Sequence, residues 1–391
     1  MKILLLILAV LLSLAIIILA VLFSLVIIKA LWVLSKTFRH GKLSKEKKEI
    51  IHRANYLVSK IRSGEQLIGE MPNFLGNQFQ GEWALYTSSM TAIALSNIAC
   101  LYPEKREWAQ THIKRIIDVT MSPKIRDYDK TRWHGEDPLD SLNGNRSHIT
   151  YLSHLAWMIG RYKHIGGDDQ YDSLYNSICE AMNRRILQSP ILNLPSYPGE
   201  SIYVPDMLVA IVALAEYSRA NDGKYKTTVD KWIQMAEVDW IDKETGMLAS
   251  YLSDEGLPLR SVRGSYSALN CSYLSLVDQK FAKRQYELFK STFKQRFPVV
   301  GIKEFIDRKC MYGWDVDAGP ILFNLSPSGT AFAIGCATTL GDNKFRKQLL
   351  RTAEIAGSTV TWNGKSHYLL ANFALVGEAV ALAMRTALFI K

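Results

Sequence analysis

Two kinds of helical segment alternate along this chain from Ser44 to its C-terminal end. The first kind is charged and amphipathic, and its members span residues 45–63, 104–121, 168–189, 225–240, 279–297 and 343–360. The second kind is apolar or small on every face, and its members span residues 84–101, 145–165, 206–221, 262–277, 326–341 and 370–388. A helix with one polar face covers an exterior, whereas a helix without a polar face must be buried.

This alternation predicts an all-α fold, an (α/α)6 toroid or barrel of six inner and six outer helices, with hardly any strand. We expect the first outer helix, 45–63, to pack beside the last inner helix, 370–388, because that contact closes the ring. An open α-solenoid or a plain helix bundle is the alternative architecture.

The connections between these segments differ in length. Long connections lead from each outer segment to the next inner one, and they span residues 64–83, 122–144, 190–205, 241–261, 298–325 and 361–369. The inner-to-outer turns are short, as at Tyr102-Pro103 and Gly341-Asp342. In a toroid the long loops all lie at one end, around the mouth of the central cavity, and long ordered loops commonly carry function.

An uncharged run from Ile3 to Ile28 precedes the helical repeat. As a helix it measures about 39 Å, enough to span a hydrocarbon layer of about 30 Å with tilt. The run is too long for a cleaved signal peptide, so we predict a single-pass anchor at 1–34, a basic linker at 35–44 and the toroid at 45–391. Because the flank after the run is strongly basic, the positive-inside rule places the toroid in the cytoplasm.

The net charge of +10 is concentrated near the N-terminus. Residues 1–48 hold eight basic residues and one acid, so that segment carries +7 and the remainder only +3. This balance argues against a nucleic-acid partner for the toroid. The five cysteines, of which Cys310 and Cys336 are the last two, are widely spaced and predict reduced thiols, with neither disulfides nor a metal site.

Redox and nucleotide chemistry find no support in the sequence. A GxGxxG fingerprint, a P-loop, a GxSxG elbow and an HExxH helix are all missing from it, so no cofactor is predicted. Proton transfer by carboxylates and tyrosines, with one histidine, is the chemistry that remains.

The loop from Tyr197 to Asp206 presents two acids and two tyrosines. Its glycine and prolines forbid regular structure, so Glu200 and Asp206 are candidate catalytic acids, and Tyr197 and Tyr203 are candidate substrate contacts. Asp206 is equally well explained as the N-cap of the helix that follows.

The run from Gly313 to Pro320 makes Asp315 and Asp317 further catalytic candidates, beside Trp314. Their alternative role is to cap their own loop through nearby amides. His154 lies within an inner segment and faces either the core or the cavity. Three more candidates for substrate binding lie in a segment that also reads as an ordinary turn: Trp133, His134 and Asp137.

Part of the chain resembles the linalool dehydratase/isomerase family. The resemblance runs from about Asp137 to Phe297, and diffuse motifs carry it: Asp137-Pro138, the helix containing Tyr151-Leu-Ser-His154-Leu, Pro198 to Val204, the Trp232 helix with Trp240 to Gly246, and Tyr286 to Phe293. It implies an (α/α)6 barrel without a cofactor, in which His154 matches the family's active-site histidine. The family's two loop cysteines correspond here to Tyr197 and Asp206, so its thiol chemistry is not expected. For the family's first-loop acid, Glu70 and Glu82 are candidates.

Three functions remain open at this stage. Aromatic platforms among carboxylates suit a glycan or glycolipid, which a membrane-anchored enzyme would hydrolyse or epimerise. By resemblance, an isoprenoid alcohol reaching the site from the bilayer would be dehydrated or isomerised, with His154, Tyr197 and Asp206 moving protons. The third is a non-catalytic tethered toroid that binds a glycan or protein. The sequence gives no oligomeric state.

Overall fold

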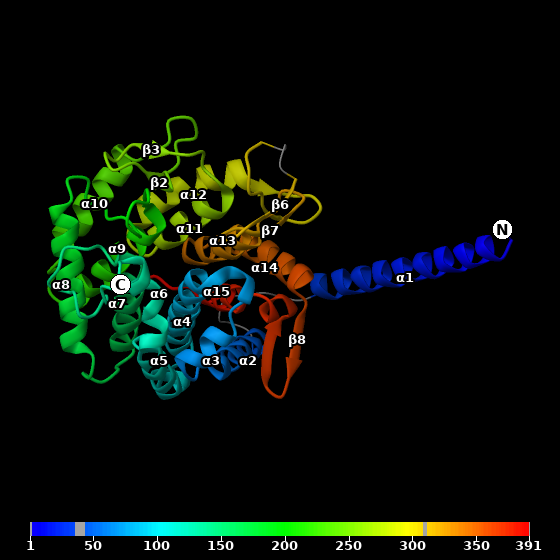
Figure 1. Cartoon of the computed structure of the whole chain (residues 1–391), viewed down its shortest axis with the longest axis horizontal. Coiled ribbons are helices and arrows are strands. Elements are labelled where there is room, and N and C mark those ends of the chain that lie inside the picture. The colour runs from blue at the N-terminus through cyan, green and yellow to red at the C-terminus, as the bar shows by residue number, and fades with distance from the viewer. Residues whose placement is uncertain (1, 36–43, 308–310, 391) are drawn as a thin grey trace.

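The computed structural model describes residues 2–35, 44–307 and 311–390 and shows an (α/α)6 barrel (Figure 1). Six inner helices form the wall of the barrel: α4 (Gly76–Leu101), α7 (Ile149–His164), α9 (Val204–Ala220), α11 (Gly264–Leu274), α13 (Pro327–Thr339) and α15 (Leu375–Arg385). Each contacts the next in chain order, and α15 returns to contact α4, so the ring closes. The predicted toroid is confirmed.

Six outer helices surround this ring: α2 (Ser44–Lys60), α5 (Arg106–Thr120), α8 (Asp172–Gln188), α10 (Lys226–Val238), α12 (Gln279–Phe293) and α14 (Asn343–Gly357). The first outer helix α2 contacts α15 as predicted. Two fully buried ion pairs hold α2 in place: Arg53 pairs with Glu378 of α15 at 2.6 Å, and Glu46 pairs with Arg346 of α14 at 2.9 Å. A short 3-10 turn, η2 (Pro103–Lys105), joins α4 to α5.

The long loops contain more regular structure than the sequence predicted. The first holds α3 (Gly64–Gly69) and η1 (Asn73–Leu75), the second holds α6 (Pro123–Arg132), and the last ends in η3 (Leu369–Asn372). The fold is mostly helical as expected, but in the part of the chain that the structure describes these loops also pair with themselves or with each other in nine strands of two to four residues: β1 (Ile202–Tyr203), β2 (Tyr251–Leu252), β3 (Pro258–Leu259), β4 (Lys294–Gln295), β5 (Gly301–Ile302), β6 (Tyr312–Asp315), β7 (Gly319–Leu322), β8 (Thr359–Trp362) and β9 (Lys365–Tyr368).

The strands form one three-stranded sheet and three hairpins, all antiparallel. Strand β1 pairs with β2, and β2 with β3, which ties the loop before α9 to the loop before α11. Strands of two to four residues are too short for alternating hydrophobicity to reveal them in sequence.

Helix α1 (Lys2–Ser35) projects from the barrel and contacts α14 (Figure 1). Its segment Ile7–Trp32 is long and apolar enough to cross a membrane, and none of that segment is buried by the protein. Helix α4 passes the same test of length and composition, but it is mostly buried as an inner helix. The predicted linker 35–44 falls almost wholly on residues 36–43, outside the described residues.

Of the cysteines, Cys179, Cys271 and Cys336 are buried free thiols, whereas Cys100 is an exposed one. Cys310 lies outside the described residues.

Candidate active site

Three carboxyl groups from different parts of the chain gather at the long-loop end of the barrel. Glu82 lies on α4, Asp206 lies in the first turn of α9, and Asp317 lies in the turn between β6 and β7. Burial raises the pKa of Glu82 from 4.5 to about 8, and the negative charges of Asp206 and Asp317 add to that rise. Glu82 therefore holds its proton at neutral pH while keeping part of its surface open to solvent.

Asp206 is held by three hydroxyl groups. Its carboxylate accepts hydrogen bonds from Tyr86 Oη at 2.8 Å, Thr150 Oγ1 at 2.6 Å and Ser196 Oγ at 2.7 Å. Burial raises the pKa of Asp206, although the three hydroxyls work in the opposite direction. Because α9 begins at Val204 and has no side-chain cap, the N-cap explanation of Asp206 was wrong.

Asp317 and Asp315 lie two residues apart, and the pKa values of their carboxyl groups are shifted in opposite directions. Asp317 is exposed at the turn, but the protein packed around its carboxyl group displaces water from it. This desolvation and the charge of Asp315 raise the pKa of Asp317 to about 6, and Tyr266 donates a hydrogen bond to it at 3.0 Å. Burial would also raise the pKa of Asp315, but the Ala318 amide and the Arg263 guanidinium outweigh it and lower that pKa. Asp315 thus caps its own loop, as the alternative explanation had it, whereas Asp317 keeps a solvent-accessible carboxylate.

Tyrosine rings lie beside these acids. Tyr203 packs on Tyr251 and Tyr266 with ring centroids 5.0 and 5.8 Å apart, and Tyr251 and Tyr266 lie 5.5 Å apart. After burial, the charge of Asp317 is the largest cause that raises the pKa of Tyr203, which places this aromatic group next to the carboxylates. Trp314 is exposed and meets the edge of Phe74, so the β6–β7 hairpin reaches the loop before α4.

Glu200 lies at the rim. It forms an ion pair with Arg132, and its side chain is 47% exposed. The Arg132 guanidinium stacks over the buried ring of Tyr197 at 4.4 Å. The charge of Glu200 contributes to the raised pKa values of both Glu82 and Asp206, so it lies near them. Tyr197 approaches Glu82 and acts to lower its pKa.

The three candidates from the second long loop have other contacts. Trp133 is buried with its ring 5.0 Å from that of His148, and His134 is exposed. Asp137 forms an ion pair with Arg126 and accepts a hydrogen bond from the Leu139 amide at 3.0 Å, which is turn geometry. Their role in substrate binding stays a prediction.

His154 is fully buried in α7. Its Nδ1 lies 2.8 Å from Ser89 Oγ, and its ring packs on Tyr86 with centroids 4.3 Å apart. Burial lowers the pKa of His154 to about 3, so the ring stays neutral. It touches the acid cluster through Tyr86, the residue that donates to Asp206.

Two parts of this acid cluster were not among the site residues predicted from the sequence. Glu82 was only a loop candidate, because α4 begins at Gly76 rather than at residue 84. Glu70, the other first-loop candidate, forms an ion pair with Lys60 at 2.9 Å. The hydroxyl ligands of Asp206 were missed, although Tyr86 stands out as a large polar ring among the small residues of an inner helix.

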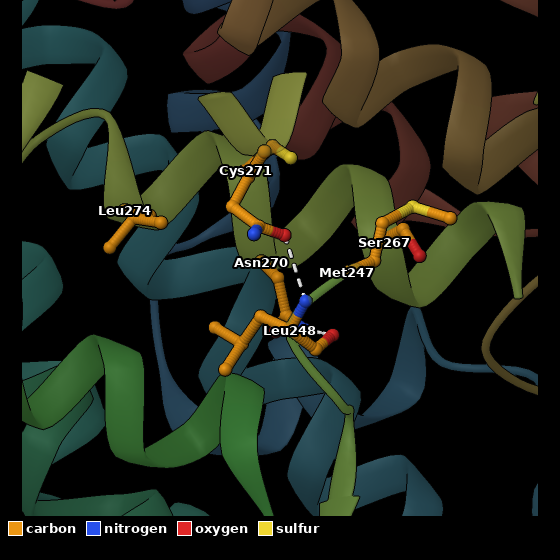
Figure 2. A pocket seen from close by; sticks show the side chains of 7 residues that line it. Met247, Leu248, Ser267, Asn270, Cys271 and Leu274 are labelled. Atoms are coloured by element: carbon orange, nitrogen blue, oxygen red, sulfur yellow. Dashed lines mark hydrogen bonds between the residues drawn. The ribbon is translucent and has the colours of Figure 1, made fainter. Parts of the chain in front are cut away.

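Small cavities occur elsewhere in the barrel. The first lies between α11 and the chain around Leu248, where Gln285 accepts from the Leu248 amide at 2.8 Å, and it leaves no room for a water molecule (Figure 2). The second, of about 10 Å³, lies among α4, α7, α11 and α15 and has room for about one water molecule.

Among residues 2–35, 44–307 and 311–390, no group of three or more His, Cys, Asp or Glu is placed to hold a metal ion.

Comparisons with known proteins give structural matches only. No protein-family model matches the chain, and no curated protein matches its sequence. A solved structure described as "Crystal structure of unsaturated glucuronyl hydrolase specific for heparin" matches with a TM-score of 0.56 at 12% identity, covering 87% of this chain and 95% of that chain. At that identity the likeness shows the barrel fold. The resemblance to the linalool dehydratase/isomerase family therefore has no support from a family model.

Proposed function

We propose that this chain is a membrane-anchored glycan hydrolase that works by proton transfer between carboxyl groups. One observation carries the proposal: at the mouth of an (α/α)6 barrel, Glu82 with a pKa of about 8 lies near Asp317 with a pKa of about 6. Between these two values one acid is protonated and the other ionised. Environments that separate two pKa values in this way assign an acid and a base.

Glu82 is the proton donor in this scheme. A glycosidic oxygen becomes a leaving group only when it gains a proton, and Glu82 still carries one at neutral pH. Asp317 is the base or nucleophile, because it is ionised above about pH 6 and accessible to solvent. After donating, Glu82 is stabilised as an anion only weakly, so it regains its proton from solvent.

In this scheme Asp206 holds neighbouring side chains in position and does not exchange a proton with the substrate. Hydrogen bonds from three hydroxyls occupy its oxygens, so it is less free than Asp317 to act as a base. Its charge helps to raise the pKa of Glu82. Removing that charge should lower the pKa of Glu82 and shift the alkaline limit of activity downward.

Two further features favour a glycan over the alternatives. The tyrosines 203, 251 and 266 form an aromatic wall beside the acids, and such rings stack on sugar faces while their hydroxyls bond to sugar hydroxyls. One solved structure that shares the fold is described as an unsaturated glucuronyl hydrolase specific for heparin. An isoprenoid alcohol would meet a cluster of acids rather than an apolar pocket.

The test measures turnover by the full chain in detergent micelles. The substrates are acidic and neutral oligosaccharides and glycolipids, with isoprenoid alcohols as the competing class. The rate should follow a bell-shaped pH profile with limits near 6 and 8, the pKa values of Asp317 and Glu82.

Two variants give the matched comparison. Glu82→Gln should lower kcat about 10²–10⁴-fold, whereas Glu200→Gln, a change at the exposed rim, should alter it less than about tenfold. Wild-type turnover by Glu82→Gln refutes the assignment of the acid. Turnover of isoprenoid alcohols but of no glycan refutes the proposed substrate class.

A further inference from the structure

The side of the barrel from which α1 leaves has features that the barrel fold does not explain. Helix α1 contacts α14, and the β6–β7 and β8–β9 hairpins lie on either side of its base (Figure 1). Figure 1 looks along the axis of the ring, and α1 runs outward in the plane of the ring, on the side opposite α10.

Large apolar side chains are exposed on both hairpins and beside them. Trp362 of β8 is 82% exposed, Tyr312 of β6 is 65% exposed, and Phe297 is 81% exposed. Gln295 ties the last of these to the hairpin region, because its Nε2 donates to the main-chain oxygens of both Phe297 and Phe323. Trp and Tyr are the residues that gather at membrane–water interfaces.

Basic residues lie next to these side chains. Lys290 and Lys294 both lie over the ring of Phe345 in α14, 5.5 and 4.6 Å from its centroid, and the positive charges of Arg296 and Lys344 reach Lys294. These four basic residues lie around one acid, Asp342, which pairs with Lys290. Lys344 belongs to α14, the helix that α1 contacts, and Arg296 precedes the exposed Phe297. Such clusters beside a membrane helix attract anionic lipid headgroups.

We propose that this side of the barrel lies flat on an anionic bilayer that α1 spans. The tip of the β8–β9 hairpin, which carries Trp362, enters the headgroup layer together with Phe297 and with Tyr312 at the open end of the β6–β7 hairpin, and the basic cluster binds anionic lipid. The axis of the ring then runs parallel to the membrane, so the mouth of the barrel opens along the bilayer surface. This inference rests on α1 as a membrane span and is independent of the reaction proposed above.

The test uses the full chain reconstituted in vesicles of phosphatidylcholine and phosphatidylglycerol. An environment-sensitive fluorophore is attached through Trp362→Cys, after the exposed Cys100 and also Cys310 have been replaced by serine. The matched control is Val238→Cys, because Val238 is 72% exposed and belongs to α10 on the far side. Lipids brominated near the headgroup serve as the quencher.

We expect about twofold or greater quenching at position 362 relative to position 238, with a blue shift of the emission at 362 only. A second label at Phe297→Cys should behave like position 362. Equal quenching at 362 and 238 overturns the proposal. Unchanged quenching at 362 in vesicles of phosphatidylcholine alone, or in high salt, overturns the part that assigns anionic lipid.

Discussion

Replacing Glu82 by glutamine should stabilise the protein while removing its activity. The physical reason is that the fold holds a carboxyl group where its charged form is disfavoured, by burial and by the charges of Asp206 and Asp317. Glutamine keeps the shape of the side chain and removes the charge. Function is commonly maintained at such a cost in stability.

The size of the effect follows from the two pKa values. The pKa of Glu82 is 4.5 in its ordinary state and about 8 in the fold, and each unit corresponds to about 1.4 kcal/mol, so the upper bound is about 5 kcal/mol. Because Glu82 keeps partial contact with solvent, we expect about 2–4 kcal/mol.

The size of the stabilisation depends on pH. The pKa of Glu82 is higher in the folded state than in the unfolded state. Its ionisation therefore costs the wild type nothing below about pH 4.5 and lowers the free energy of unfolding progressively as pH rises to about 8. The glutamine variant has no such loss. Its stability should match that of the wild type near pH 4.5 and exceed it by the full amount above pH 8.

Urea unfolding of the full chain in detergent micelles, followed by circular dichroism between about pH 4.5 and pH 9, measures this difference. Glu200→Gln is the control, since Glu200 is exposed and its ion pair with Arg132 should contribute less than about 1 kcal/mol at any pH. A Glu82→Gln variant that is no more stable than the wild type at pH 9 would show that the carboxyl group is well solvated, and the assignment of Glu82 as the acid would fail.

Two remaining predictions concern the barrel itself, and urea midpoints measure both. Arg53→Met should cost about 3–5 kcal/mol, because Glu378 would be left buried without its partner; a loss below about 1 kcal/mol would contradict this. Gly264→Ala should prevent native folding, since a Cβ there would lie 1.9 Å from the main-chain oxygen of Lys303. Its control is Gly377→Ala, where nothing lies within 4 Å and the helix should gain about 0.5–1 kcal/mol; equal effects of the two alanines would refute the packing argument.

The architecture could be predicted from the sequence because it depends on local patterns of polar and apolar residues. Whether a helix is polar on one face or on none can be read over a few turns, and the two kinds alternate without exception. The start of α4 was predicted at residue 84, but the helix begins at Gly76. Gly81 is typical of a loop, yet it lies inside α4, where the close packing of α6 requires a glycine because a Cβ there would lie 2.4 Å from Tyr128 Cβ.

The site could be predicted only in part, because the chemistry of an acid depends on distant packing. Glu82 and Glu200 are both acids in or beside long loops, and nothing local separates them. The barrel places Glu82 against two other carboxylates and leaves Glu200 at the rim with Arg132. Likewise, the sequence left Asp206 open as a catalytic acid or a helix cap, because its three hydroxyl partners come from α4, from α7 and from the loop before α9.

The outer helix α2 shows the same limit of local patterns. Its charges predict a solvated exterior, yet Glu46 and Arg53 are buried. Glu46 accepts from Arg346 of α14 and Arg385 of α15, at 2.9 and 3.2 Å, while Arg53 reaches Glu378 of α15. Buried ion pairs of this kind add little net stability, but a shift in register would leave each charge without its partner, so we infer that they specify how the ring closes. Since α2 is the first helix after α1, the helix that closes the ring is also the one nearest in sequence to the proposed anchor.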